Sequence, residues 1–122
     1  MARVIALVPD LLFGSQVQGS LNAAGHSVAL AGDEAKVRER LAEGGGAVLV
    51  VDLTDDRFDG VAIREALAAD GALAGVHSLA FYSHVDAAVR ERAQQAGFDL
   101  VVPRSRMARE GAALVSGLAA EG

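Results

Sequence analysis

Short apolar runs alternate along the chain with longer segments in which apolar residues recur at helical spacing. The most continuous run spans residues 47–51 and ends at Asp52. Uninterrupted apolar runs of this length are typical of strands that are buried on both faces of a parallel sheet. The same pattern predicts five strands, at residues 4–8, 27–31, 47–51, 76–81 and 98–102.

Polar residues mark where helices begin between these strands. Asp33 and Asp86 are predicted N-caps, and Ser15 is the candidate cap of the first helix. Right-handed crossovers between five strand–helix units place helices on both faces of the sheet. We therefore expect one domain over residues 1–122, an α/β protein of the flavodoxin-like type. Its doubly wound, five-stranded parallel sheet has the order 2-1-3-4-5 in a three-layer sandwich.

Composition narrows the class of function. The 122 residues include no cysteine, which excludes disulfides and thiolate metal sites. The net charge is −5, whereas nucleic-acid binding needs a basic face, and aromatic residues make up only 4%, too few for a base-stacking platform. No apolar run approaches the roughly 18 residues of a membrane span. We expect a cytoplasmic domain with neither a nucleic-acid nor a membrane partner.

Several polar residues follow the predicted strands, and the carboxyl ends of parallel strands meet at one edge of a sheet. Asp10 and Asp52 follow the first and third strands, and Arg104 follows the fifth. The loop after the fourth strand adds a hydroxyl from Tyr82 or Ser83. We expect a cleft in which two carboxylates, a hydroxyl and an arginine converge. The alternative is that each residue caps a loop or balances a neighbouring charge.

The spacing of these residues resembles that of the receiver domains of two-component response regulators, along almost the whole chain. In that family an Asp ends the third strand and an Asp-Gly pair follows seven residues later. Asp52 and Asp59-Gly60 have that interval. Residues 89–99 (VRERAQQAGFD) are similar to the family's pattern at the fourth helix and fifth strand. Arg104 stands seven residues after Gly97, where the family has a lysine.

The resemblance implies phosphoryl transfer from a kinase phosphohistidine to the Asp52 carboxylate. It also implies a magnesium ion, which Asp10, Asp52 and the backbone carbonyl of Thr54 would hold weakly. Arg104 would contact the phosphoryl oxygens with the charge of the family's lysine but a different geometry.

The resemblance leaves two residues open for the hydroxyl that donates to the phosphoryl group. Counting back from Gly97 gives Tyr82, and a loop one residue shorter gives Ser83. The implied partners are a histidine kinase or a downstream effector. The family's usual contact surface is the fourth helix, the fifth strand and the fifth helix.

The chain departs from the family at the groups that support the transfer. Pro9 replaces one acid of the pair that ends the first strand, Asp55-Asp56 replaces the usual Met-Pro, and Val101 replaces an aromatic residue. Loss of preorganised charge slows phosphoryl transfer by orders of magnitude. We therefore predict a stand-alone degenerate receiver that acts in signalling through protein contact. At most, it accepts a phosphoryl group at Asp52.

Two alternatives to the degenerate receiver remain open. The first is an active response regulator phosphorylated on Asp52. The second is a small-ligand-binding domain, in which Leu11, Leu12 and Phe13 form an apolar lid over the cleft. The same three residues otherwise form a hydrophobic staple onto the first helix. The apolar stretch of the last helix is a candidate homodimer surface.

Three further residues have competing interpretations. His26 lies in a predicted turn and is expected to be solvated. His84 is a candidate metal ligand beside the two strand-end aspartates, although no ligand spacing supports it. Residues 103–106 form either an anion clamp or a solvated loop in which Ser105 caps the last helix.

Overall fold

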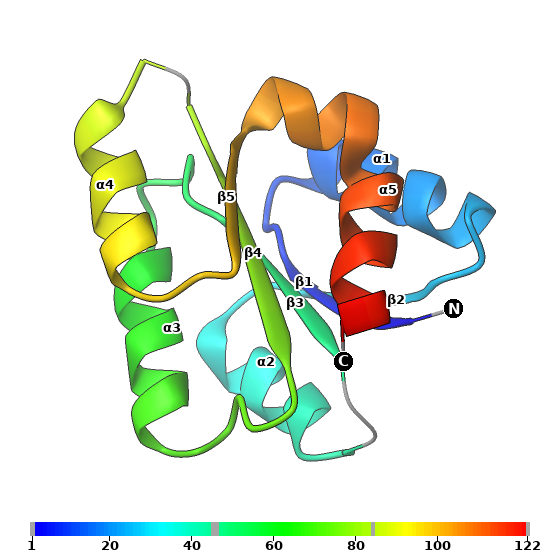
Figure 1. Ribbon diagram of the computed structural model, residues 1–122, viewed down its shortest axis with the longest axis horizontal. Coiled ribbons are helices and arrows are strands. Elements are labelled where there is room, and N and C mark those ends of the chain that lie inside the picture. Colours follow the sequence, from blue (N-terminus) through cyan, green and yellow to red (C-terminus); the bar gives the residue numbers. More distant parts are fainter. Residues whose placement is uncertain (1, 45–46, 84, 122) are drawn as a thin grey trace.

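The computed structural model describes residues 2–44, 47–83 and 85–121. The proposed metal ligand His84 therefore lies outside the described residues. Strands and helices alternate along the chain (Figure 1): β1 (Arg3–Leu7), α1 (Leu11–Ala23), β2 (Ser27–Ala31), α2 (Glu34–Leu41), β3 (Val48–Asp52), α3 (Gly60–Ala69), β4 (His77–Tyr82), α4 (Ala87–Gln95), β5 (Leu100–Pro103) and α5 (Arg104–Glu121). Within the described residues, no helix is long and apolar enough to cross a membrane.

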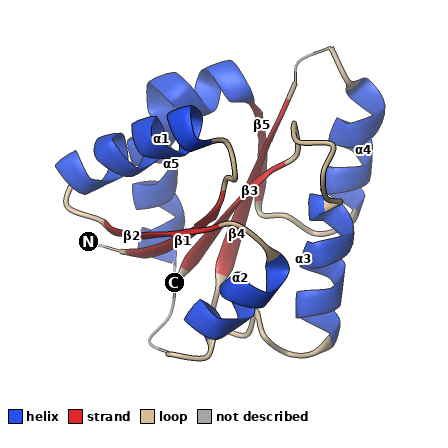
Figure 2. Ribbon diagram, turned by 180° about the vertical axis from the view of Figure 1, so that it is seen from behind, coloured by secondary structure: helices blue, strands red, loops and turns tan. Residues whose placement is uncertain are grey.

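The five strands form one parallel sheet of order β2-β1-β3-β4-β5, which confirms the predicted fold class and strand order. Figure 2 shows α1 and α5 on one face of the sheet and α2, α3 and α4 on the other. All five residues of β3 are buried, as its uninterrupted apolar run predicts. Along β3, Val48 and Val50 pack under α1 and α5, whereas Leu49 and Val51 pack under the other three helices.

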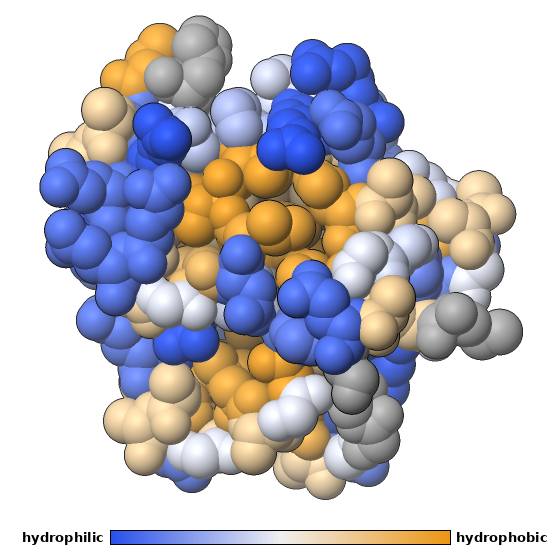
Figure 3. All heavy atoms as spheres, in the orientation of Figure 1, coloured by the Kyte–Doolittle hydropathy of each residue, from blue (hydrophilic) through white to orange (hydrophobic). Residues whose placement is uncertain are grey.

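The fifth strand lies at an edge of the sheet and remains partly uncovered. Leu100 and Val101 are half-buried although they pack against the two cores. In Figure 3 an apolar surface lies over β5, between α4 and α5. The fold therefore leaves an apolar strip on the face that the sequence resemblance associates with partner binding.

Aspartate side chains cap four of the helices. Asp33, Asp59 and Asp86 each accept a backbone N–H from the first turn of the helix that follows. The prediction for the first helix was wrong, because Asp10 caps it and Ser15 lies inside α1. Asp10 follows β1 directly, so the helix begins as soon as the strand has ended.

The last helix also begins earlier than predicted. It starts at Arg104, directly after β5, and Ser105 is therefore inside α5 rather than its cap. The interpretation of residues 103–106 as a solvated loop is wrong. The consequence for the cleft is that Arg104 projects from the first turn of a helix.

Gly60 allows the start of α3 to pack closely against the end of β3. A Cβ atom at Gly60 would lie 2.6 Å from Cγ1 of Val51 and 2.7 Å from Cδ2 of Leu53. The start of α3 thus packs against the end of β3 so closely that only glycine fits. The Asp-Gly pair positions α3 against the strand that carries Asp52.

His26 is not solvated, contrary to the prediction. Its residue is only 5% exposed. The backbone N–H of Ala2 donates to its Nδ1 (3.0 Å), and its Nε2 lies 2.9 Å from Oγ of Ser116 on α5. Because a backbone amide can only donate, Nδ1 is unprotonated and Nε2 carries the proton. Neutral His26 thus joins the start of β1 to α5.

Candidate functional site

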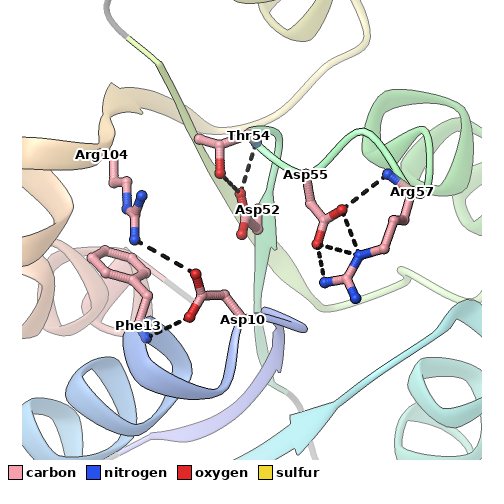
Figure 4. Close-up of polar contacts among 7 residues, drawn as sticks. All are labelled: Asp10, Phe13, Asp52, Thr54, Asp55, Arg57 and Arg104. Carbon is pink, nitrogen blue, oxygen red and sulfur yellow. Dashed lines mark hydrogen bonds and ion pairs between the residues drawn. The ribbon is translucent and has the colours of Figure 1, made fainter.

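A broad open cleft lies at the carboxyl ends of β1 and β3 (Figure 4). Its lining residues come from the ends of β1 and β3, the loop after β3 and the starts of α1 and α5: Pro9, Asp10, Leu11, Leu12, Asp52, Thr54, Asp55, Asp56, Arg57 and Arg104. Asp10, Asp52, Thr54 and Arg104 were expected to converge there, and the structure brings them together.

Asp52 ends β3 and is only 2% exposed. Its Oδ1 accepts two hydrogen bonds from Thr54, one from the backbone N–H (2.7 Å) and one from the hydroxyl (2.6 Å). Burial raises the pKa of Asp52 above its ordinary value, and the bonds from Thr54 oppose that increase only in part. One carboxylate oxygen of Asp52 is therefore occupied, and the charged form is disfavoured by its surroundings.

Each carboxylate oxygen of Asp10 faces a different partner. Its Oδ1 accepts the backbone N–H of Phe13 at 3.0 Å, which caps α1. Its Oδ2 lies 4.0 Å from Nη2 of Arg104. The neighbouring Pro9 supplies no acid, so the end of β1 contributes one carboxylate that already has two partners.

Arg104 is held by Phe13 as well as by Asp10. Its Cζ lies 4.2 Å from the centroid of the Phe13 ring, within cation–π distance. The Phe13 ring is buried and packs against Phe81 with centroids 5.1 Å apart. The guanidinium thus lies over a ring that is fixed in the core, beside the start of α1.

The loop after β3 contains two further aspartates that could replace the missing acid. Arg57 holds Asp55 through its guanidinium, with Nη2 2.6 Å from Oδ2 and Nε 3.0 Å from Oδ1, and through its backbone N–H at 2.9 Å. These bonds lower the pKa of Asp55 to about 2. Asp55 is therefore ionised, and the charge of Arg57 balances its own. Asp56 lines the cleft as an exposed side chain.

The structure separates the two candidates for the hydroxyl. Ser83 lines a groove next to the cleft together with Thr54 and Arg104. Tyr82 is the last residue of β4, is buried and pairs with Pro103 of β5. Ser83 is thus the hydroxyl that shares a groove with Arg104.

Leu11 and Leu12 form neither a lid nor a staple. They are the first two residues of α1 and are 84% and 73% exposed. They line the rim of an open cleft, while Phe13 alone turns into the core. The alternative of an apolar lid over a closed ligand pocket therefore does not match the structure.

The donor set offers a magnesium ion only a weak site. Mg²⁺ requires near-octahedral oxygen ligands. Among the residues described, no group of three or more His, Asp or Glu side chains is placed to hold a metal. Oδ1 of Asp52 is taken by Thr54, and Asp10 faces the cation of Arg104. The set of Asp10, Asp52 and the Thr54 carbonyl therefore offers few oxygens next to a competing positive charge, and water would have to complete the coordination of a bound Mg²⁺.

Sequence reasoning missed two contacts that shape this cleft. It treated Phe13 as part of a lid or a staple, although Phe13 lies under Arg104. It did not pair Arg57 with Asp55, although the two are separated by one residue in a polar loop. An arginine two residues after an aspartate in a polar loop could have predicted the second contact.

No protein-family model and no curated protein matches the chain. In structure it is similar to the receiver domain of the TMAO respiratory system response regulator TorR, with a TM-score of 0.86 and 16% identity over 99% of this chain and 98% of that chain. The receiver domain of the Francisella response regulator 1452 is also similar, with a TM-score of 0.82 and 14% identity over 97% of this chain and 96% of that chain. The signal receiver domain of a protein described as the response regulator NarL of Mycobacterium tuberculosis has a TM-score of 0.79 and 22% identity, over 97% of this chain and 95% of that chain. The chain therefore has the receiver fold of response regulators.

Proposed function

We propose that the chain is a degenerate receiver, which acts in signalling through contact with another protein and without phosphorylation of Asp52. The observation that carries the proposal is the set of contacts that Asp10 and Arg104 make within the chain. The single acid at the end of β1 caps α1 and faces Arg104, and Arg104 lies over the Phe13 ring. The carboxylate and the cation that would have to stabilise a transferred phosphoryl group thus face each other at the outer limit of ion-pair distance.

Phosphoryl transfer depends almost entirely on positioning and on stabilisation of negative charge. Among the described residues the cleft offers at most a weak magnesium site, and burial disfavours the ionised form of Asp52 that would act as the nucleophile. Removal of such groups reduces transfer rates by orders of magnitude. These features support a function that does not depend on phosphoryl transfer to Asp52.

The apolar strip over β5 supports a contact function. It lies between α4 and α5 (Figure 3), on the face through which the sequence resemblance implies partner binding. The partner class that we propose is a signalling protein, either a histidine kinase or a downstream effector.

The test is incubation with acetyl phosphate and magnesium, followed by measurement of the intact mass. We expect no mass change under conditions that phosphorylate an active receiver, which serves as the positive control. A gain of one phosphoryl group that is lost in Asp52→Asn would overturn the proposal and establish a phospho-acceptor.

A second arm tests the reason for the inactivity. The double variant Pro9→Asp, Arg104→Lys restores the second acid and the lysine that the resemblance implies. We expect this variant to gain a phosphoryl group at Asp52, and its own Asp52→Asn version is the matched control. An unchanged mass in the folded double variant would show that these two positions do not explain the inactivity.

A further inference from the structure

α4 has little apolar attachment to the rest of the molecule. The structure describes all nine of its residues, and only Ala93 among them is buried. α2 also buries one residue, but that residue is the larger Val37. α1, α3 and α5 each bury three or more. Apolar burial stabilises a helix roughly in proportion to the area removed from water, so the methyl group of Ala93 holds α4 only weakly.

A polar side chain from α3 holds the C-terminal end of α4. That end lies beside α3 in both ribbon views (Figures 1 and 2). The half-buried Arg64 of α3 donates from Nη1 to the carbonyl of Ala96 and from Nη2 to the carbonyl of Gly97, both at 2.9 Å. These carbonyls follow the last turn of α4, where the helix dipole places partial negative charge. Arg64 therefore caps a helix to which it does not belong.

The guanidinium of Arg64 has further contacts that fix its position. Its Cζ lies 5.8 Å from the centroid of the buried Phe98 ring, within cation–π distance. Its Nε lies 3.5 Å from Oγ of the buried Ser78 on β4. A Cβ atom at Gly97 would lie 3.2 Å from Nη1, so the guanidinium packs directly on the backbone of this turn. One side chain thus joins α3, β4 and the turn between α4 and β5.

A second contact between the two helices, from Arg92 of α4 to Asp59 at the start of α3, is weaker. Nη2 of Arg92 lies 3.1 Å from Oδ2 of Asp59, and both side chains are more than half exposed. Exposed ion pairs contribute little to stability. The apolar packing nearby is incomplete, because Val61 of α3 and Val89 of α4 line a groove there. Arg64 is therefore the principal link between α4 and α3.

Segments with few buried apolar contacts open locally at a lower free energy than the core of a protein. From the two carbonyl contacts and the single buried alanine, we propose that α4 opens as a separate unit and that Arg64 is the positioning residue that holds it closed. The consequence for binding rests on the proposed contact function. Closed α4 forms one wall of the apolar strip over β5 (Figure 3). A partner that needs this wall binds only the closed chain, so its apparent affinity falls with the closed fraction.

Native-state hydrogen exchange of the 122-residue chain tests the proposal, because it measures the opening of each element separately. We expect the amides of residues 90–96 to exchange through local opening, and those of β1 and β3 only through global unfolding. Arg64→Ala should speed exchange in α4 by at least about tenfold beyond any change in β1 and β3. Arg64→Lys keeps the charge but not the two-pronged donor, and it should restore part of the protection.

Arg38→Ala is the matched control. Arg38 of α2 pairs with Glu34 and with Asp70 at the end of α3 that is remote from α4, so its loss should leave exchange in α4 unchanged. If Arg64→Ala does not fold, Arg64→Lys should show the same pattern at a smaller size. The proposal is overturned if wild-type α4 exchanges only through global unfolding, or if the Arg64 variants affect α4 no more than Arg38→Ala does. Exchange in α4 does not report on Asp52, so this proposal and the lack of phosphorylation can fail separately.

Discussion

Asp52 and His26 are two buried titratable side chains at opposite ends of the sheet, and they have similar hydrogen-bond partners. Each is no more than 5% exposed, accepts a backbone N–H and lies within hydrogen-bond distance of a hydroxyl. Their surroundings differ. Asp52 borders an open cleft and is acted on by the charges of Asp55 and Arg104. His26 packs against α1, β2 and the second half of α5, which carry no charge.

The difference shows that one fold can bury His26 as part of its framework and bury Asp52 beside an open, charged cleft. The nearest charged residue on β1, Arg3, donates to the backbone carbonyls of Gly44 and Arg40 rather than facing His26. The N–H of Ala2 donates to Nδ1 of His26, and Nε2 lies 2.9 Å from Oγ of Ser116. His26 is therefore a neutral structural link, whereas Asp52 remains open to charge and ligands.

The largest effect is expected from His26→Phe. It removes the acceptor for Ala2 and the donor to Ser116 together. Leaving buried polar groups unpaired should lower the free energy of unfolding by about 1–3 kcal/mol. Urea denaturation at neutral pH measures the change. His26→Asn retains an acceptor near the Nδ1 position and should recover part of the loss. Equal losses in both variants would show that ring packing, not hydrogen bonding, explains the role of His26.

An intermediate effect is expected from Thr54→Val, which removes the hydroxyl that donates to Asp52 but keeps the backbone N–H. The loss of one hydrogen bond to a buried carboxylate should cost about 1 kcal/mol at neutral pH. The pKa of Asp52 should rise further, because a bond that favours its charged form is gone. Carboxyl NMR titration of Asp52 measures this shift. Thr54→Ser keeps the hydroxyl and is the control, and an unchanged pKa in Thr54→Val contradicts the assignment.

The smallest effect concerns the pH dependence of stability. Burial raises the pKa of folded Asp52, so the folded chain binds its proton more readily than the unfolded chain. The resulting stabilisation is complete below the ordinary value of 3.8 and is lost as the pH rises through the raised value. Asp52→Asn should therefore raise the urea midpoint at neutral pH and flatten this pH dependence. Asp56→Asn, at an exposed position of the same cleft, is the control, and an identical profile for both variants would refute the linkage.

Strand positions and the meeting of strand ends could be predicted because they follow from chain pattern and topology. The apolar run before Asp52 indicated a doubly buried strand, and parallel pairing then placed Asp10, Asp52 and Arg104 at one edge. The start of α1 was misplaced because Ser15 and Asp10 give equivalent local signals for a cap. Which of them begins the helix depends on how directly α1 follows β1.

The remaining errors concern contacts between side chains that are distant in sequence. His26 and Ser116 are separated by 90 residues, and a turn position gives no sign of such a partner. The contact between Arg104 and Phe13 depends on the first turns of two helices, both of which begin earlier than predicted. Long-range side-chain pairing thus requires the packed structure, even where the fold class is evident.

The junction at Asp59 and Gly60 sets a fixed length for the loop that precedes it. Asp59 caps α3 and pairs with Arg92 of α4 at 3.1 Å, and Gly60 leaves no room for a side chain against the end of β3. Residues 53–58 are thus a spacer anchored at both ends, in which side chains can change but the number of residues cannot. Evolution or design can therefore rewrite the chemistry of the cleft by substitution, while an insertion or deletion there would detach α3 from the strand.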